Sequence, residues 1–392
     1  MSKGNIYLYS PVALEPWDWR NPDTKGIGGS ETAHIETAKG LAKRGYTVHS
    51  FTHLPPSTKS STDVTFDVVW RDITEVDTAL ENAPENSVWL VYRDIHIFNK
   101  DLPTNQKYWF IAQDVIYDFT EEQLAKIDRY ICLCRTHAAF TAEKFPSIKD
   151  RIYISTNGIR RDLIESIEAN ERIIRDPYRL IYTSSPDRGL AMILEQWFRI
   201  KERVPQASLH IYYGFNNMDE IINKLGGQSD LVETKRHLMD LMLQPGITFK
   251  GRANQPELVA AMFEAQLWAA PHSWPETSCI TCMEMMATGV VPITNNHWAL
   301  KDNVFAGVLL PCIPQDNKLM AAIWVEEVIR TLQNYDRPDK IRKQMMIDSR
   351  DSFSWDKIID SQLVPWIEED LHCATSSKPP LSLPPQQLSL VL

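Results

Sequence analysis

The sequence lacks any apolar run as long as the roughly 18 residues that a membrane-spanning helix needs. It also lacks the apolar segment of a signal peptide after its first residues, Met1-Ser2-Lys3-Gly4-Asn5. Six cysteines among 392 residues are too few for a disulfide scaffold. These absences predict a cytoplasmic protein without a membrane span.

Positive charge is also scarce, since 41 lysines and arginines face 51 aspartates and glutamates and the net charge is −10. This balance argues against broad nucleic-acid binding by a basic surface, although it leaves a local basic groove open. Cys279-x-x-Cys282 begins a predicted helix and Cys132-x-Cys134 lies on a predicted buried strand. We therefore interpret both pairs as packing residues rather than as zinc or redox sites. No Asp-x-Asp pair stands out as a metal site.

Strand and helix patterns alternate along the chain, which predicts an α/β fold, and the length predicts two domains. The first unit of this kind runs from the strand Ile6–Tyr9 through the turn 26–29 to the strand Tyr46–Phe51. Glycines in such a turn are typical of dinucleotide-binding dehydrogenases. Here the third glycine of that motif is missing and no acidic residue ends the second strand, so a dehydrogenase is disfavoured.

The richest stretch begins with the apolar strand Leu267–Ala270 and leads into a helix that we expect to open at Thr277 or Ser278 and to end at Gly289. The amino end of a helix is a ready site for an anion such as a diphosphate. Glu276 precedes the helix and Glu284 lies about two turns along it. Carboxylates would repel a phosphate but accept hydrogen bonds from hydroxyls. Two of them on either side of an anion site suit a nucleotide-sugar.

Glu276 and Glu284 have E-x7-E spacing, between Pro271-His272-Ser273 and Gly289-Val290-Val291-Pro292. This block resembles the motif of retaining glycosyltransferases of the GT-B fold, of the group 1 or family 4 type. The resemblance implies two Rossmann-like parallel-sheet domains that face a central cleft, with a C-terminal helix crossing back to the first domain.

We expect four regions, which are an N-terminal acceptor-side domain (1–165), a C-terminal nucleotide-sugar-binding domain (166–355), a returning helix (356–373) and a disordered Pro- and Ser-rich tail (374–392).

The resemblance also assigns roles to residues outside the E-x7-E block. In the family, a basic pair after the first strand of the second domain binds the donor diphosphate. Arg188 matches one member of that pair, while Ser184 or Ser185 stands where the family has an arginine. The family usually has His-Asp after a strand of the first domain, and this chain has Gln113-Asp114.

The predicted site has three groups of residues. The catalytic group is Glu276, Arg188, Asp114 and Gln113; the donor-binding group is Glu284, Thr277, Ser278, Ser184, Ser185, Lys250, Gly251, Arg252, Gly28 and Gly29; and the acceptor-side group is Arg93 and Asp94. Arg93-Asp94 and Gln113-Asp114 end predicted strands, where ligands gather in parallel sheets. Solvated turn residues remain the alternative for these pairs, and Lys250 could equally be a surface residue.

The sequence thus predicts a retaining, metal-independent glycosyltransferase that needs no cofactor. The donor would be a nucleotide-sugar, UDP- or GDP-linked, and the acceptor a glycan, a lipid-linked group or a protein. Two alternatives stay open. One is transfer to a nucleic-acid base, which the acidic balance mildly disfavours, and the other is a degenerate protein that binds sugar nucleotides without turning them over.

Overall fold

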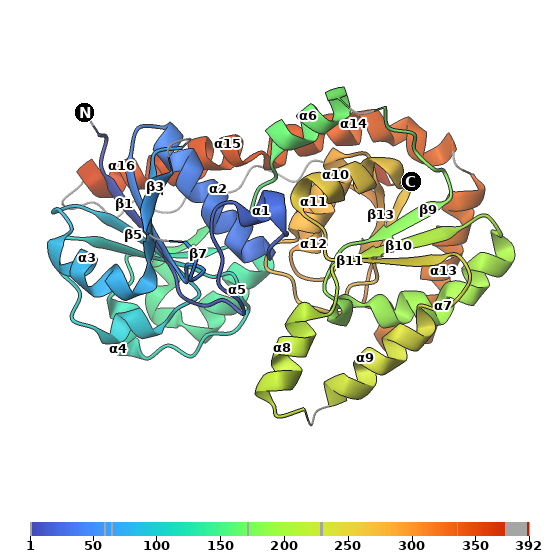
Figure 1. Ribbon diagram of the computed structural model, residues 1–392, viewed down its shortest axis with the longest axis horizontal. Coiled ribbons are helices and arrows are strands. Elements are labelled where there is room, and N and C mark those ends of the chain that lie inside the picture. Colours follow the sequence, from blue (N-terminus) through green and yellow to red (C-terminus); the bar gives the residue numbers. More distant parts are fainter. Residues whose placement is uncertain are drawn as a thin grey trace. The chain divides into compact units, whose positions relative to one another are not determined.

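The computed structural model describes residues 2–58, 60–63, 66–170, 172–227, 230–334, 336–372 and 390–391. These residues form two compact units (Figure 1). Unit 1 comprises the described parts of Met1–Pro22, Ile27–Gly158 and Ser352–Pro385, and unit 2 comprises those of Asp23–Gly26, Ile159–Asp351 and Gln386–Leu392.

The boundary between the units falls after Gly158, whereas the sequence led us to place it at residue 165. The difference arises because α6 (Arg161–Asn170) packs against α10 (Gln255–Glu264) in unit 2. Ile164 and Ile167 are the buried residues of α6, one turn apart on its apolar face.

Unit 1 is built on an eight-stranded sheet in the order β3-β4-β2-β1-β5-β6-β7-β8, in which only the β3–β4 pair is antiparallel. Its strands are β1 (Asn5–Ser10), β2 (Thr47–Thr52), β3 (Ser61–Asp63), β4 (Val68–Asp72), β5 (Val88–Tyr92), β6 (Lys107–Ile111), β7 (Arg129–Cys132) and β8 (Ile152–Ile154). Its helices are α2 (Gly29–Lys43), α3 (Val76–Asn82), α4 (Glu121–Ala125), α5 (Arg135–Lys144), α15 (Trp355–Ile358) and α16 (Val364–His372), and the short α1 (Asn21–Thr24) lies at a unit boundary in the sequence.

Both faces of this sheet are buried, because alternate residues of each strand enter different cores. Ile6 and Leu8 of β1 pack with α2 and the C-terminal helices, whereas Tyr7 and Tyr9 enter the core of the opposite face. All five residues of β5 are buried, as expected for a central strand of a parallel sheet.

The C-terminal segment belongs to unit 1, which confirms the predicted return of the last helix. Trp355 and Trp366 lie in the same core as α2, and a π-helical turn (Ile359–Leu363) connects α15 to α16. Asp370 anchors the end of α16, because it accepts hydrogen bonds from the Trp109 indole at 2.6 Å and from Arg129 at 2.6 Å. In Figure 1 these helices are red beside the blue α2.

Unit 2 has a second sheet, of parallel strands in the order β11-β10-β9-β12-β13-β14-β15. Its strands are β9 (Arg179–Tyr182), β10 (Ser208–Tyr212), β11 (Ile247–Gly251), β12 (Leu267–Ala269), β13 (Val291–Asn295), β14 (Ala306–Leu310) and β15 (Leu390–Val391). Besides α6 and α10, its helices are α7 (Leu190–Arg203), α8 (Asn216–Lys224), α9 (Asp230–Leu241), α11 (Ile280–Ala287), α12 (Leu300–Asn303), α13 (Lys318–Gln333) and α14 (Asp336–Phe353), which ends beyond the unit boundary.

The tail differs from its prediction at one point. Residues 373–389 and 392 lie outside the described residues, so the expected disorder of 374–392 concerns mostly residues that are not described. Leu390–Val391, however, forms β15 in parallel register with Ala306 and Gly307 of β14. This pairing supplies main-chain partners to a strand that would otherwise be the edge of the sheet.

Candidate functional site

The carboxyl end of β9 leads into the turn that holds Ser184, Ser185 and Arg188. Ser184 is buried, and the Ser185 carbonyl accepts hydrogen bonds from the Arg188 amide and the Tyr182 hydroxyl at 3.0 and 2.8 Å. The turn ends at Gly189 with φ +113°, where an added Cβ would lie 2.0 Å from the Pro271 carbonyl oxygen. Glycine is therefore required there, and its close approach fixes the β9 turn against the loop of the E-x7-E block.

Arg188, after the carboxyl end of β9, contacts two acidic residues and an aromatic ring. One guanidinium nitrogen lies 3.3 Å from Glu276 Oε1 and another lies 3.3 Å from Asp187 Oδ2. The guanidinium carbon also stands 4.0 Å from the ring centre of Trp274, a cation–π contact on a side chain that is 45% exposed. Arg188 and Glu276, predicted as partners in one site, do meet in the structure.

Glu276 is held in a setting that disfavours its charge. Burial raises the pKa of its carboxyl, while Arg188 works in the opposite direction. Beside it, His272 is fully buried with Nδ1 3.8 Å from Glu276 Oε1, and neither ring nitrogen has a hydrogen-bond partner among the described residues. Burial, together with Arg188 and His297, lowers the pKa of His272 to about 3, so its imidazole is neutral.

The helix that carries Glu284 starts later than we expected from the sequence. Thr277 and Ser278 do not begin it: α11 starts at Ile280, its N-cap residue is Cys279, and no side chain caps it. The physical reason is a long-range contact, because the Cys279 amide donates to Asn303 Oδ1 at 3.0 Å and fixes the chain just before the first turn. Thr277 and Ser278 are buried in the loop that precedes the positive end of the helix dipole.

Glu284 lies on α11 and is only 5% exposed. Its Oε1 accepts a hydrogen bond from Gln255 Nε2 at 3.1 Å. Burial raises the pKa of Glu284 to about 7, although the hydrogen bond from Gln255 and the charge of Arg160 both lower it. A buried carboxyl whose pKa is near 7 is typical of functional sites.

β11 places the remaining predicted donor-binding residues. Lys250 is exposed on this edge strand, which agrees with the surface alternative left open for it. Gly251 has φ +72° and its carbonyl accepts the Tyr213 amide at 2.9 Å, whereas Arg252 is half-buried. Gly251 and Arg252 therefore lie at the carboxyl end of β11, and Arg188 lies in the turn after β9 of the same sheet.

In unit 1, the glycine turn makes room for an acid. Gly28 is the N-cap residue of α2 and Gly29 is its first residue. A Cβ on Gly28 would lie 2.3 Å from Glu31 Oε2, so the missing side chain lets this carboxylate fold back over the helix start. Burial raises the pKa of Glu31, and the nearby Arg93 opposes that rise.

Arg93 and Asp114, which follow the ends of β5 and β6, contact each other in unit 1. Arg93 Nε and Nη2 donate to the two oxygens of Asp114 at 2.7 and 3.2 Å, and Glu31 Oε1 lies 3.9 Å from Arg93 Nη1. Arg93 has φ +65°, an unusual backbone conformation for a non-glycine residue. Asp94 has a different partner: its buried carboxylate accepts a hydrogen bond from the His96 amide at 3.0 Å.

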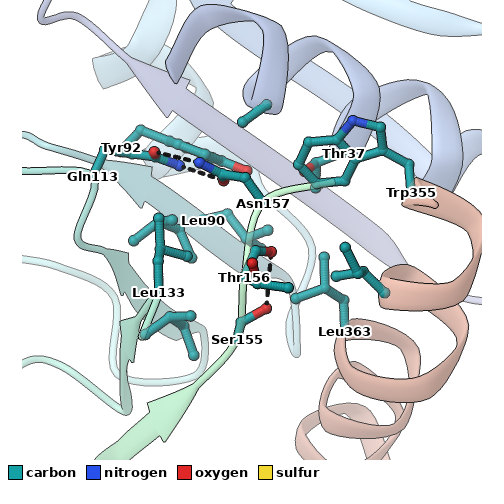
Figure 2. A pocket seen from close by; sticks show the side chains of 14 residues that line it. Thr37, Leu90, Tyr92, Gln113, Leu133, Ser155, Thr156, Asn157, Trp355 and Leu363 are labelled. Atoms are coloured by element: carbon teal, nitrogen blue, oxygen red, sulfur yellow. Dashed lines mark hydrogen bonds between the residues drawn. The ribbon is translucent and has the colours of Figure 1, made fainter. Parts of the chain in front are cut away.

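Gln113 faces a small cavity of about 20 Å³ inside unit 1, roughly the space of one water molecule (Figure 2). Its amide pairs with that of Asn157 through two hydrogen bonds of 3.2 Å, and Gln113 is 9% exposed. Trp355 and Leu363 of the C-terminal segment line the same cavity. A sugar hydroxyl would reach the Gln113 amide only after this amide pair opened.

Sequence reasoning missed Gln255, His272, Glu31 and Asn157 as members of these clusters. The first two contact the E-x7-E glutamates, and the other two contact Arg93 and Gln113. His272 stands inside the quoted E-x7-E block, which is a usable signal, whereas Gln255 reaches Glu284 by a long-range hydrogen bond that no local pattern indicates.

Of the described cysteines that are not in a disulfide, Cys132, Cys134, Cys279 and Cys282 are buried and Cys312 is exposed. Burial raises the pKa of Cys132, Cys279 and Cys282. Among the described residues, no group of three or more His, Cys, Asp or Glu side chains is arranged to hold a metal ion. Within the same part of the chain, no helix combines the length and apolar composition that crossing a membrane requires.

Comparison with known proteins gives a structural match. No family model and no curated protein sequence matches the chain. The solved structure of sucrose-phosphate synthase from Thermosynechococcus elongatus is similar with a TM-score of 0.67 and 14% identity over 93% of this chain and 98% of that one.

Two further structures agree. A glycosyltransferase from Rickettsia africae has a TM-score of 0.66 and 14% identity over 96% of this chain and 100% of its own. The Anabaena protein HepE, solved with UDP and glucose, has a TM-score of 0.61 and 13% identity over 92% of this chain and 100% of its own. The chain therefore has the GT-B fold that its sequence predicted.

Proposed function

We propose that the chain is a retaining glycosyltransferase that moves a sugar from a nucleoside diphosphate sugar to an acceptor hydroxyl on a glycan, a lipid-linked group or a protein. The observation that carries the proposal is the arrangement in unit 2 of Arg188, Glu276 and the start of α11, with the buried Glu284 on the same helix. A fold shared with glycosyltransferases supports it, and HepE was solved with UDP and with UDP-glucose, which makes UDP the first ligand to test.

In the proposed reaction, the bond between the sugar's anomeric carbon and the diphosphate oxygen breaks as the acceptor oxygen bonds to the same face of that carbon. The acceptor's proton passes to the departing diphosphate. Arg188 and the amino end of α11 would stabilise the charge that develops on the diphosphate, which is commonly the largest catalytic term. The reaction so written needs no enzyme nucleophile, metal or cofactor.

The carboxyls would bind hydroxyls on the two sides of the diphosphate. We assign Glu284 to the ribose and Glu276 to the transferred sugar. Arg188 now lies against Glu276, so donor binding must draw the guanidinium toward the diphosphate. In exchange for its cation, Glu276 would accept hydrogen bonds from the hydroxyls of the transferred sugar.

The other predicted residues take supporting places in this proposal. Ser184, Ser185, Thr277 and Ser278 border the diphosphate, and Gly251 and Arg252 border the base with Lys250 at the rim. Gly28 and Gly29 of unit 1 remain proposed for donor binding. Arg93, Asp94, Gln113 and Asp114 remain proposed for the acceptor side and the catalytic centre.

A melting-temperature screen against UDP-, GDP- and ADP-sugars, followed by an assay of nucleotide release with mixed acceptors, tests the proposal. A ligand at 100 times its Kd should add about 2.7 kcal/mol of stability, and turnover should require an acceptor. Glu284→Ala should mainly raise the Kd for the donor, whereas Glu276→Ala should mainly lower kcat. A protein that no nucleotide-sugar stabilises would refute the proposal, and binding without turnover would indicate a sugar-nucleotide-binding protein instead.

A further inference from the structure

Tyr213, the residue after β10, has a backbone conformation that tyrosine rarely adopts. Its φ is +119°, and Gly214 follows with φ +89°. The other described non-glycine residues with positive φ, which are Asp67, Asn86, Arg93 and Trp298, have values from +48° to +65°. Those values lie in or beside the left-handed helical region, whereas the value of Tyr213 lies far outside it, where glycine is the ordinary residue.

The main-chain contact of Tyr213 does not require a tyrosine. Tyr213 is half-buried and is not part of the buried core. Its amide donates to the Gly251 carbonyl at 2.9 Å, a main-chain bond that glycine would make equally well. Its hydroxyl accepts a hydrogen bond from Asn217 Nδ2 at 3.1 Å, which orients the ring from α8. Strain of this kind is typically retained at functional sites.

The position of Tyr213 connects the turns that carry the predicted donor-binding residues. β10 lies between β9 and β11 in the sheet. The carboxyl end of β9 leads to Arg188, and the end of β11 leads to Arg252, whose amide nitrogen would be 3.4 Å from a Cβ on Gly214. Tyr213 therefore follows the strand that lies between these two turns, and Asn217 of α8 holds its hydroxyl.

We propose that Tyr213 is a donor-binding residue whose ring contacts the nucleoside of a nucleoside diphosphate, between the turn after β9 and the turn at Gly251–Arg252. The inference rests on the proposed function and adds to it one residue and one contact. An aromatic face stacks on a base or ribose without selecting strongly by hydrogen bonds.

The test uses the full chain and isothermal titration with UDP, with GDP and with inorganic pyrophosphate. Tyr213→Gly relieves the strained φ, so it should melt at or above the temperature of the unaltered protein. It should also bind the nucleoside diphosphate roughly ten- to a hundred-fold more weakly, while its affinity for pyrophosphate stays unchanged. Tyr213→Phe, which keeps the ring, should stay within a few-fold of the unaltered protein, whereas Tyr213→Leu should lose affinity like the glycine variant.

Asn86→Gly is the matched control, because Asn86 also has positive φ (+61°) but lies in a turn before β5 of unit 1. That variant should leave nucleotide affinity unchanged. Full nucleotide affinity in both Tyr213→Gly and Tyr213→Leu would overturn the inference, and so would an equal loss for nucleotide and pyrophosphate, which would indicate a distorted phosphate turn. An unaltered protein that binds neither UDP nor GDP would instead refute the proposed function, and the inference with it.

Discussion

Each unit holds one arginine between two acids at the carboxyl edge of its sheet, yet the two arginines are held differently. In unit 1, Arg93 makes two hydrogen bonds to Asp114 at 2.7 and 3.2 Å, on a backbone with φ +65°. In unit 2, Arg188 has single contacts of 3.3 Å to Asp187 and to Glu276 and lies over Trp274. Paired bonds of the first kind fix a guanidinium, whereas longer single contacts allow it to exchange partners.

The polar groups around each arginine follow the same contrast. In unit 1, the Gln113 and Asn157 amides satisfy one another beside a cavity of about 20 Å³. In unit 2, Glu276 and Glu284 are carboxyls whose pKa values burial raises, and His272 is buried without a hydrogen-bond partner among the described residues. The carboxyl edge of the unit 2 sheet therefore carries buried polar groups that a polar ligand would stabilise by hydrogen bonding.

Replacing Arg188 and Arg93 by alanine, one at a time, should give the largest difference in effect between the two sheet edges. Arg188→Ala should lower kcat/KM by roughly 10²–10³-fold, because it removes a group that stabilises the departing diphosphate. Arg93→Ala should leave the Kd for UDP within a few-fold, since Arg93 is committed to Asp114. Titration calorimetry with UDP and steady-state kinetics on both variants check this. Equal loss of UDP affinity in the two variants would contradict the proposal that the sheet edge of unit 2, and not that of unit 1, binds the nucleotide.

Replacing Glu284 should give the next largest effect, on how stability and UDP binding depend on pH. Its pKa is about 7 in the folded protein against a usual 4.5, so the folded state binds more protons between these values. The stability it contributes is full below about pH 4.5 and is lost as the pH rises through 7. Glu284→Gln should therefore be more stable than the unaltered protein above pH 7, by up to about 3 kcal/mol.

Urea unfolding between pH 5 and 8 measures this difference, with Glu257→Gln, an acid on the surface of α10, as the control. UDP binding should strengthen as the pH rises through 7, because a carboxylate accepts ribose hydrogen bonds better than a neutral acid. The same pH slope in Glu284→Gln would show that another group titrates.

The amide pair of unit 1 should give the smallest effect. Gln113→Ala or Asn157→Ala leaves a buried amide without its partner, at a cost of about 1–3 kcal/mol of stability. The double variant should lose less than the sum of the two by about 1 kcal/mol, as contacting residues do. Chemical denaturation of the three variants measures this coupling. A fall in kcat far larger in Gln113→Ala than in Asn157→Ala would instead place Gln113 in contact with substrate.

The sequence was sufficient for what depends on local pattern and on rules about sheets. The alternation of strands and helices predicted an α/β fold, and the resemblance of the E-x7-E block implied its two Rossmann-like sheets. The rule that ligands gather at strand ends singled out Arg93 and Asp114, which meet in the structure. Gly289 ends the helix region as expected, with φ +82°. These features follow from neighbouring residues or from topology alone.

The features that the sequence did not predict depend on contacts between residues far apart in the chain. The start of α11 was predicted wrongly because Asn303, far along the sequence, takes the Cys279 amide. Gln255 reaches Glu284 by a hydrogen bond across 29 residues, and the Tyr213 amide donates to the Gly251 carbonyl of the neighbouring strand. No local spacing encodes such contacts.

Hydrogen exchange with and without UDP tests the central claim most directly, because it reports on each unit separately. The account predicts slower exchange in the β9 turn at 184–189 and in the loop and helix start at 274–282, with the α2 start in unit 1 changing less. Protection confined to unit 1, or no protection at saturating UDP and GDP, would contradict the claim that Arg188 and the start of α11 bind a nucleoside diphosphate.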